Sequence, residues 1–235
     1  MAAIPIKNRL SPKAPQDTPS RILEAAERLF LQHGFAATSM RMITAEAEVN
    51  LAAVNYHFGS KDALIEAVFT RRLGPLNRQR LGHLDRLESL AEGAPLKLET
   101  IVEAFIGSAF VNEGSANDGA RLFAQLLGRA YSEPSGGVRD ILYNQNKEVI
   151  KRFKAALKKA LPHLSAEELV WRMHFVFGSI SYTQSGTDAL RLVAKYELSD
   201  GSYPQTVVKR LLPFLCAGLQ APATMHAPTV LAKVS

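Results

Sequence analysis

Cysteine is almost absent from this chain of 235 residues. Its one cysteine, Cys216, has no partner for an intrachain disulfide, and so low a cysteine content fits a reducing compartment. Long hydrophobic runs are missing too, since no stretch reaches the 18 uninterrupted apolar residues that suggest a membrane span. The N-terminal segment is polar, is interrupted by proline and lacks the apolar part of a signal peptide. We therefore expect a cytoplasmic protein that does not enter the membrane.

The sequence also lacks the motifs of common catalytic and cofactor sites. Its six histidines never show the H-E-x-x-H spacing of a zinc site. It contains no G-x-S-x-G elbow, no Walker loop and no G-x-G-x-x-G segment. Cys216 lies in the apolar segment LLPFLCAGL, where packing is its expected role. These absences predict a protein that is not an enzyme and that needs neither a metal nor a cofactor.

A strong excess of positive charge is missing as well. The chain has 28 Lys and Arg against 22 Asp and Glu, a net charge of +6. Residues 1–65 hold seven basic and six acidic side chains, so their net charge is 7 − 6 = +1. This balance permits a polyanionic partner but does not identify one.

What the sequence does contain is helical patterning. Hydrophobic residues make up 47% of the chain, and no alternation of period two extends over six residues. We predict an all-α fold with a small N-terminal helical unit and a larger helical body. The predicted organisation is a flexible arm over 1–18, a three-helix N-terminal unit over 19–65, a helical body over 66–220 and a flexible tail over 221–235.

Four helices are expected near the N-terminus. An apolar stripe with helical spacing runs from Ile22 to Phe30, with Ser20 as its expected cap and Gly34 at its end. Thr38 and Ser39 are expected to open a second helix. A third helix is expected from Leu51 to Phe58, and Ser60 is expected to cap a long fourth helix that begins at Lys61.

The rest of the chain shows further amphipathic segments separated by Gly- and Pro-containing turns. Within the fourth helix, Pro75 is expected to kink or end the helix, since proline cannot donate a hydrogen bond to residue 71. The later segments are expected near 97–112, 118–131, 136–161, 166–186, 187–196 and 204–219.

The second and third helices together have the form of a helix–turn–helix. A short helix after a tight turn can enter the DNA major groove, which is about 12 Å wide. Ala52 and Ala53 would allow the backbone to approach DNA closely, and Asn55 could bond base edges or phosphates. The predicted DNA-binding residues are Thr38, Ser39, Arg41, Asn50, Leu51, Ala52, Ala53, Asn55, Tyr56, His57 and Lys61.

These residues form an ordered string that resembles one family. The segment RILEAAERLFLQHG (21–34), the run Thr38-Ser39-Met40-Arg41 and the segment VNLAAVNYHFGSK (49–61) are similar to the head of the TetR family of repressors. The resemblance covers roughly residues 20–70. It implies a homodimeric regulator that binds a palindromic operator and is released by a small molecule bound in a variable helical body.

One residue departs from the family's pattern. Family members usually have glycine in the turn of the helix–turn–helix, and this chain has Glu48. If Glu48 adopts a positive φ, the side chain costs about 1 kcal/mol relative to glycine. It also brings a negative charge close to the expected DNA.

The body resembles the fatty-acid-responsive branch of this family, typified by PsrA, in RLFAQLLGRAYSEPSGGVRDILYNQNKEVIKRF and WRMHFVFGSISYTQSGTDALR. This implies a long-chain fatty acid or acyl-CoA as effector. Such a ligand needs an apolar tunnel with one polar group at its end, for which Arg121, Arg129, Arg172 and His174 are candidates. The expected ligand-binding residues are Phe105, Phe110, Arg121, Phe123, Leu127, Met173, His174 and Phe177.

Two other interpretations stay open at this point. The chain could be a regulator of efflux or stress genes that responds to an unrelated hydrophobic molecule, or a helical interaction module that does not bind DNA. The basic residues of the arm, Lys7, Arg9 and Lys13, either contact DNA or remain solvated. For the expected homodimer, the segments 166–186 and 204–219 are the predicted interface.

Overall fold

The computed structural model describes residues 17–111, 118–132, 136–184 and 203–223. Throughout these ranges the chain folds into helices and turns without a β-strand, which confirms the predicted all-α fold. None of the helices in these ranges has both the length and the apolar character needed to cross a membrane. The residues of the arm before 17, those of the tail from 224 onward and the segment 187–196 lie outside the described residues.

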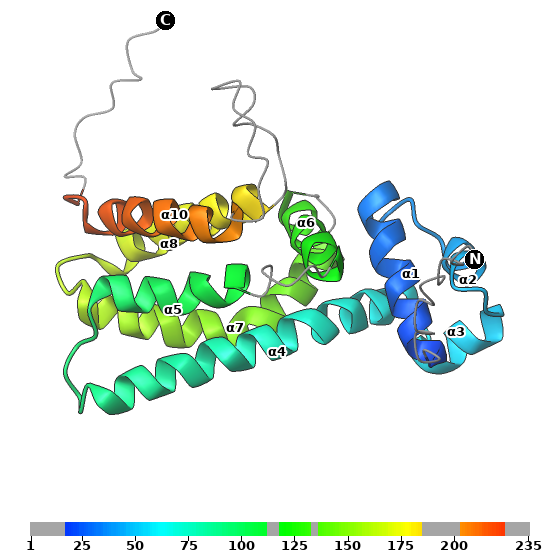
Figure 1. Ribbon diagram of the computed structural model, residues 1–235, viewed down its shortest axis with the longest axis horizontal. Coiled ribbons are helices and arrows are strands. Elements are labelled where there is room, and N and C mark those ends of the chain that lie inside the picture. The colour runs from blue at the N-terminus through cyan, green and yellow to red at the C-terminus, as the bar shows by residue number, and fades with distance from the viewer. Residues whose placement is uncertain (1–16, 112–117, 133–135, 185–202, 224–235) are drawn as a thin grey trace, which may run out of the picture.

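The first three helices form the head, and the remaining helices form the body (Figure 1). The head consists of α1 (Thr18–His33), α2 (Met40–Glu46) and α3 (Leu51–Phe58). The long helix α4 (Lys61–Leu90) leads from the head along the body. The body continues with α5 (Leu98–Val111), α6 (Asp118–Ser132), α7 (Gly136–Ala160), α8 (Ala166–Gln184) and α10 (Tyr203–Gln220).

The start of α1 differs from the prediction. Asp17, not Ser20, is the N-cap, because the Asp17 carboxylate accepts the backbone N–H of Ser20 at 3.2 Å. Pro19 occupies the first turn, where a missing N–H costs nothing. The predicted end is confirmed: Gly34 has φ +87° and donates its N–H to the carbonyl of Phe30.

The next three helix starts agree with the sequence. The side-chain oxygens of Ser39, Asn50 and Ser60 each accept the N–H three residues later, at 3.2, 2.7 and 3.1 Å. The third helix has the predicted bounds, Leu51–Phe58. The fourth continues through Pro75 to Leu90, so the proline does not end it.

Two hydrophobic clusters make up the core. The first joins the head to the body: Phe30, Ile43 and Val54 belong to it together with Phe69 of α4 and Leu126 of α6. The second lies farther along the body and draws residues from α4, α5, α7, α8 and α10. Because α6 packs against α1 and contributes to the first cluster, the head does not have a core of its own.

Polar contacts reinforce this joint. Arg72 of α4 holds the buried Glu27 of α1 through two hydrogen bonds, of 2.9 and 2.8 Å. This partner raises the pKa of Arg72. On α6, Arg129 donates to the carbonyl of Leu31 at 2.7 Å, near the end of α1. The head is therefore held by α4 on one side and by α6 on the other.

Candidate nucleic-acid interface and cavity

The turn between α2 and α3 contains the residue that departs from the family's pattern. Glu48 has φ +51°, the left-handed conformation that favours glycine. Arg21 of α1 stabilises this turn by donating to the carbonyl oxygens of Ala47 and Glu48 at 2.6 and 3.1 Å. The carboxylate of Glu48 also lies 3.6 Å from Arg21 but is 86% exposed, so that ion pair contributes little.

One face of α3 is buried and the other is open to solvent. Val54 is fully buried in the first hydrophobic cluster and fixes the rotation of the helix. The side chains of Asn55, Tyr56 and His57 consequently point outward, and Tyr56 is 86% exposed. Leu51 and Ala52 are exposed as well, and Ala53 is half-buried. This face offers hydrogen-bonding groups and small side chains but no formal charge.

The residues at the starts of α2 and α3 act as caps. Ser39 and Asn50 are exposed, and their side-chain oxygens already accept backbone N–H groups. Thr38 differs from the prediction, because it is 1% exposed and its hydroxyl donates to the carbonyls of Leu29 and Gly34. Thr38 therefore ties the α1–α2 loop together, and its side chain is not available to a phosphate.

The two cations that were predicted near DNA occupy different environments. Arg41 is exposed on α2. Lys61, at the start of α4, is half-buried and donates to the carbonyl of Ala36 at 3.0 Å. Both belong to the same part of the head as α3, and Lys61 additionally links α4 to the α1–α2 loop.

A cavity of about 330 Å³ lies in the body where the two hydrophobic clusters meet. Leu73 and Leu127 of the first cluster form part of its wall, and Val149 and Ile180 of the second cluster form another part. The remaining lining residues are Arg80, Phe105, Tyr131, Asn146, Ile150, His174, Phe177, Gly178 and Ser181. Five helices, α4 to α8, contribute to it.

The structure separates the residues that were expected to bind the ligand. Phe105, Leu127, His174 and Phe177 line the cavity. Phe123 does not, because it packs edge-on against Phe69 in the first cluster, with ring centroids 5.9 Å apart. Phe110 lies in α5 and Arg121 in α6, but their side chains are outside the described residues.

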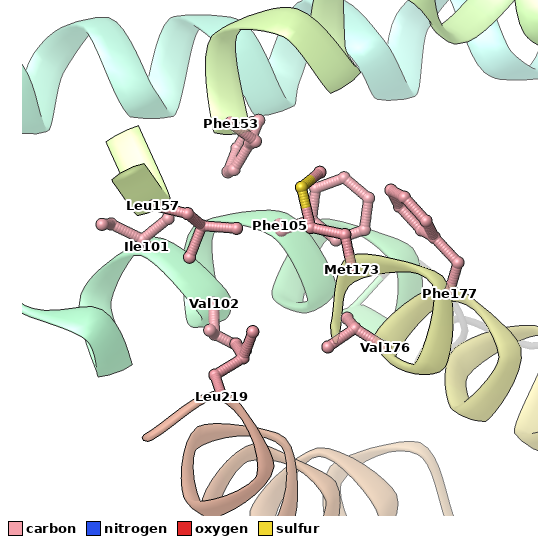
Figure 2. A pocket seen from close by; sticks show the side chains of 9 residues that line it. All are labelled: Ile101, Val102, Phe105, Phe153, Leu157, Met173, Val176, Phe177 and Leu219. Atoms are coloured by element: carbon pink, nitrogen blue, oxygen red, sulfur yellow. The ribbon is translucent and has the colours of Figure 1, made fainter. Parts of the chain in front are cut away.

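A second, smaller space of about 30 Å³ adjoins the cavity and is entirely apolar. Met173, another residue expected to bind the ligand, lines this space. Phe105 and Phe177 border both spaces, and their rings meet edge to face at 5.5 Å. Figure 2 shows these side chains together with the remaining lining residues, Ile101, Val102, Phe153, Leu157, Val176 and Leu219.

Two arginines that were candidates for a ligand's polar end have structural partners instead. Arg129 donates to Leu31 of α1, as described above. Arg172 is buried and donates to the carbonyls of Leu219, Ala221 and Pro222 at 2.8, 2.6 and 3.1 Å, which caps the end of α10. Neither belongs to the cavity lining, whereas His174 does.

The cation in the cavity is Arg80, which the sequence interpretation missed. Arg80 is 7% exposed, and burial lowers its pKa to about 10, so it is still protonated at neutral pH. Leu73, Asn77, Arg80 and Leu84 follow one another at helical spacing, and the structure shows that all four are buried, which the spacing alone does not reveal. A cation and an amide on the buried stripe of α4 are chemically out of place in a plain core.

Large apolar side chains remain exposed on α8 and α10. Trp171 and Phe175 are one helical turn apart on α8, stacked with ring centroids at 6.2 Å and 53% and 62% exposed. Phe214 of α10 is 68% exposed. An apolar surface of this kind is typical of a contact with another protein chain.

Two family models match the chain, one in each part. The model described as bacterial regulatory proteins of the tetR family matches residues 22–68. The model described as the tetracyclin repressor-like C-terminal domain matches residues 103–218. The first contains the helix–turn–helix, and the second includes most of the cavity-lining residues.

Curated relatives share the head. An HTH-type transcriptional repressor of Mycobacterium tuberculosis, Rv3405c, is 45% identical over 60 residues, which cover 26% of this chain and 32% of the relative. The HTH-type transcriptional regulator UidR of Escherichia coli K12 is 40% identical over 53 residues, or 23% and 27% of the two chains. The match thus spans about a third of the length of these relatives or less.

Solved structures share the whole fold at low sequence identity. The fatty acid degradation regulator FadR of Bacillus halodurans is 17% identical, with a TM-score of 0.57 over 88% of this chain and 99% of its own. FadR of Bacillus subtilis, solved with stearoyl-CoA, is 14% identical, with a TM-score of 0.57 over 85% and 98%. SmeT, solved with triclosan, is 21% identical, with a TM-score of 0.56 over 91% and 99%.

A helix–turn–helix head joined to an all-helical body defines a class of regulatory proteins, and the family models match both parts of this chain. The chain belongs to the TetR family of bacterial transcriptional regulators.

Proposed function

We propose that this protein is a homodimeric, sequence-specific DNA-binding repressor that a hydrophobic small molecule releases from a palindromic operator. The observation that carries the proposal is the outward face of α3. Asn55, Tyr56 and His57 project from a helix whose start, rotation and turn are all fixed by described contacts. A short, neutral, well-positioned helix suits base-edge readout in the major groove.

In the proposed mode of DNA binding, residues close to α3 contact the phosphates. Arg41, Ser39 and Lys61 lie on α2, at its start and at the start of α4, and would position the helix in the groove. Because the head's net charge is only +1, few phosphates are neutralised per subunit. We expect operator affinity to fall with rising salt, with a moderate slope.

Dimerisation is needed because one short helix makes few base contacts. A two-fold dimer would present two copies of α3 to half-sites about 34 Å apart. The exposed Trp171 and Phe175 of α8 and Phe214 of α10 support an interface on these helices. This is the same pair of segments that the sequence indicates.

The position of the cavity supports control by a ligand. Leu127 of α6 lines the cavity, and two residues later Arg129 bonds the end of α1. Phe123, one turn earlier, packs against Phe69 below the head. A ligand that favours a different placement of α6 would therefore shift the two heads of a dimer away from the operator spacing, to the extent that it binds the two states differently.

The cavity favours a largely apolar effector. Most of its lining is aliphatic or aromatic, with a few polar groups. The structural likeness to a FadR solved with stearoyl-CoA supports a fatty acid or acyl-CoA, and the likeness to SmeT solved with triclosan supports an unrelated hydrophobic molecule. The resemblance of the body to the PsrA-type branch favours the acyl ligand.

A gel shift on DNA upstream of the protein's own gene tests the proposed DNA binding. We expect Asn55→Ala to weaken binding at least about tenfold, since a lost base contact in each half-site costs about 1–3 kcal/mol. Gln32→Ala is the matched control, because Gln32 is exposed on α1, outside the α2–α3 pair. Far-UV circular dichroism should show both variants folded.

Other outcomes of this experiment would reject parts of the proposal. Equal affinity for upstream and unrelated DNA would remove sequence specificity. No binding to any DNA would favour a helical interaction module. Equal footprints for wild type and Asn55→Ala would remove Asn55 from the interface.

A further inference from the structure

Arg80 is a buried cation without an anionic partner among the residues that the structure describes. Its Nε donates to the backbone carbonyl of Phe105 at 2.9 Å, and its Nη1 donates to the side-chain oxygen of Asn77 at 3.3 Å. The guanidinium also lies over the Phe105 ring, 4.4 Å from the centroid. All three contacts are with neutral groups, so none of them balances the charge.

The amide groups next to Arg80 are neutral and already hydrogen-bonded, and burial raises the pKa of the nearby Tyr131, whose phenol is therefore neutral as well. Asn77 donates to the carbonyl of Gln145 and to the side-chain oxygen of Asn146, at 2.9 and 3.2 Å. Asn146 in turn donates to the carbonyl of Leu142 at 2.8 Å. This chain of amides crosses from α4 to α7 and holds Arg80 in place, but it supplies no carboxylate.

A guanidinium has five N–H donors, and the described hydrogen bonds use two of them. The Nη2 group has no described protein partner, and Arg80 is part of the cavity lining. A buried charge without a counter-charge is energetically costly. A plain core would hold leucine or methionine at this place, as it does at Leu73 and Leu84 on the same stripe of α4.

The rest of the cavity is suited to an apolar body. Leu73, Leu127 and Val149 supply aliphatic wall, and Phe105 and Phe177 form the border with the smaller apolar space. The cavity therefore combines one buried cation with a large hydrophobic surface. A molecule that satisfies both has one anionic group and an apolar remainder.

We propose that Arg80 is the binding residue for the carboxylate of the effector, and that the effector is an apolar monocarboxylic acid in its free form. This inference rests on the proposed ligand control. A carboxylate accepts two parallel hydrogen bonds from guanidinium and cancels the buried charge. A CoA thioester, an ester or an alcohol carries no charge at that position and leaves Arg80 uncompensated.

Calorimetric titration of the wild-type protein tests the proposal with four probes of one chain length. The probes are decanoate, decanol, methyl decanoate and decanoyl-CoA. We expect decanoate to bind at least about tenfold more tightly than each of the other three, because hydrogen bonds to charged groups are worth about 1.5–3 kcal/mol. Equal or tighter binding of decanol or decanoyl-CoA would overturn the proposal.

Substitutions then assign the preference to Arg80. Arg80→Met keeps an unbranched side chain and removes the charge. The ratio of decanoate affinity to decanol affinity should therefore fall to about one, while decanol still binds. Arg78→Met is the control, since Arg78 is exposed on the same helix, and it should keep the wild-type ratio. A ratio unchanged in Arg80→Met would assign the carboxylate to another residue and contradict the proposal.

Arg80→Lys replaces Arg80→Met if the latter does not fold. Lysine keeps the charge but loses the paired donors, so its ratio of decanoate affinity to decanol affinity should lie between the wild-type value and one. The wild-type series can overturn the proposal without any variant. Failure of the proposed function would look different. In that case decanoate would bind with the expected preference but leave the gel shift unchanged, or no upstream DNA would be bound.

Discussion

The α2–α3 surface and the cavity are built in opposite ways. The surface comes from a single short stretch of chain, Thr38 to Lys61, in which each helix start is set by a neighbouring Ser or Asn. The cavity is lined by residues between Leu73 and Ser181 that come from five helices, α4 to α8. The surface is therefore encoded by local contacts, and the cavity by packing between distant segments.

The two regions also differ in what their polar groups do. On α3, polar side chains face solvent and cost nothing to leave without a protein partner. At the cavity, the lining residues Arg80 and Asn146 and the adjoining Asn77 are buried, so each of their contacts matters energetically. The contacts among α1, α4 and α6 connect the two regions. A structural change at the cavity would reach the α2–α3 surface through these contacts.

The largest effect is expected from removing an aromatic side chain at this joint. Phe69 is fully buried and contacts Phe35 of the head and Phe123 of α6, with centroids 5.9 Å away in each case. Phe69→Ala should lower the free energy of unfolding by about 3–5 kcal/mol. Urea denaturation followed by circular dichroism measures it.

The control for this substitution is Tyr143→Ala, because Tyr143 is an aromatic residue of α7 that is 59% exposed. It should change the free energy of unfolding by less than about 0.5 kcal/mol. If Phe69→Ala were equally mild, the head would not depend on packing against the body.

The buried ion pair at the joint should give the next largest effect. Arg72→Met leaves the Glu27 carboxylate buried without its partner, and should cost about 3 kcal/mol of unfolding free energy. The double variant Glu27→Met with Arg72→Met removes both charges and should be more stable than Arg72→Met alone. Chemical denaturation of the three proteins decides this, and a double variant no better than the single one would contradict it.

These two regions were predictable from sequence to different degrees. The bounds of α3, the caps Ser39 and Ser60 and the end at Gly34 follow from residues within one turn of each site. Two predictions for the head were wrong. Asp17 and not Ser20 caps α1, although both side chains can cap a helix. The Thr38 side chain points inward because its hydroxyl donates to the carbonyls of Leu29 and Gly34.

In the body, helices were predictable but the roles of side chains were not. Arg129 and Arg172 look like free cations in the sequence, yet each meets the carbonyl end of a helix distant in sequence. In the sequence, Arg80 resembles a surface arginine of α4. Packing of α4 against α5 and α7 sets the orientation of the helix and turns Arg80 inward. The rotation of a long helix depends on tertiary contacts, so the sequence alone could not identify the buried cation.

A smaller effect is expected where Phe177 separates the cavity from the adjoining apolar space. Phe177→Ala should join the two spaces, because Phe177 and Phe105 border both. Binding should then shift from decanoate toward dodecanoate by about tenfold, since each of the two added methylenes finds apolar surface worth about 0.8 kcal/mol. Calorimetry with both acids measures the shift, and Tyr143→Ala should leave the preference unchanged.

The smallest effect is expected in the turn of the head. Glu48→Gly removes a side chain from a residue at φ +51° and should raise the free energy of unfolding by up to about 1 kcal/mol. The hydrogen bonds of Arg21 to the turn carbonyls do not need the Glu48 side chain and should persist. Thermal unfolding checks the stability, and a lower melting temperature would show that the Glu48 side chain outweighs the backbone strain.

We expect occupation of the cavity to control DNA binding by the head. The most direct test is the affinity of the protein for its upstream DNA, measured by fluorescence anisotropy at increasing decanoate concentration. We predict at least about a tenfold loss of affinity at saturating decanoate, with an equal loss of decanoate affinity when DNA is bound. Unchanged DNA affinity at concentrations that fill the cavity by calorimetry would contradict the account.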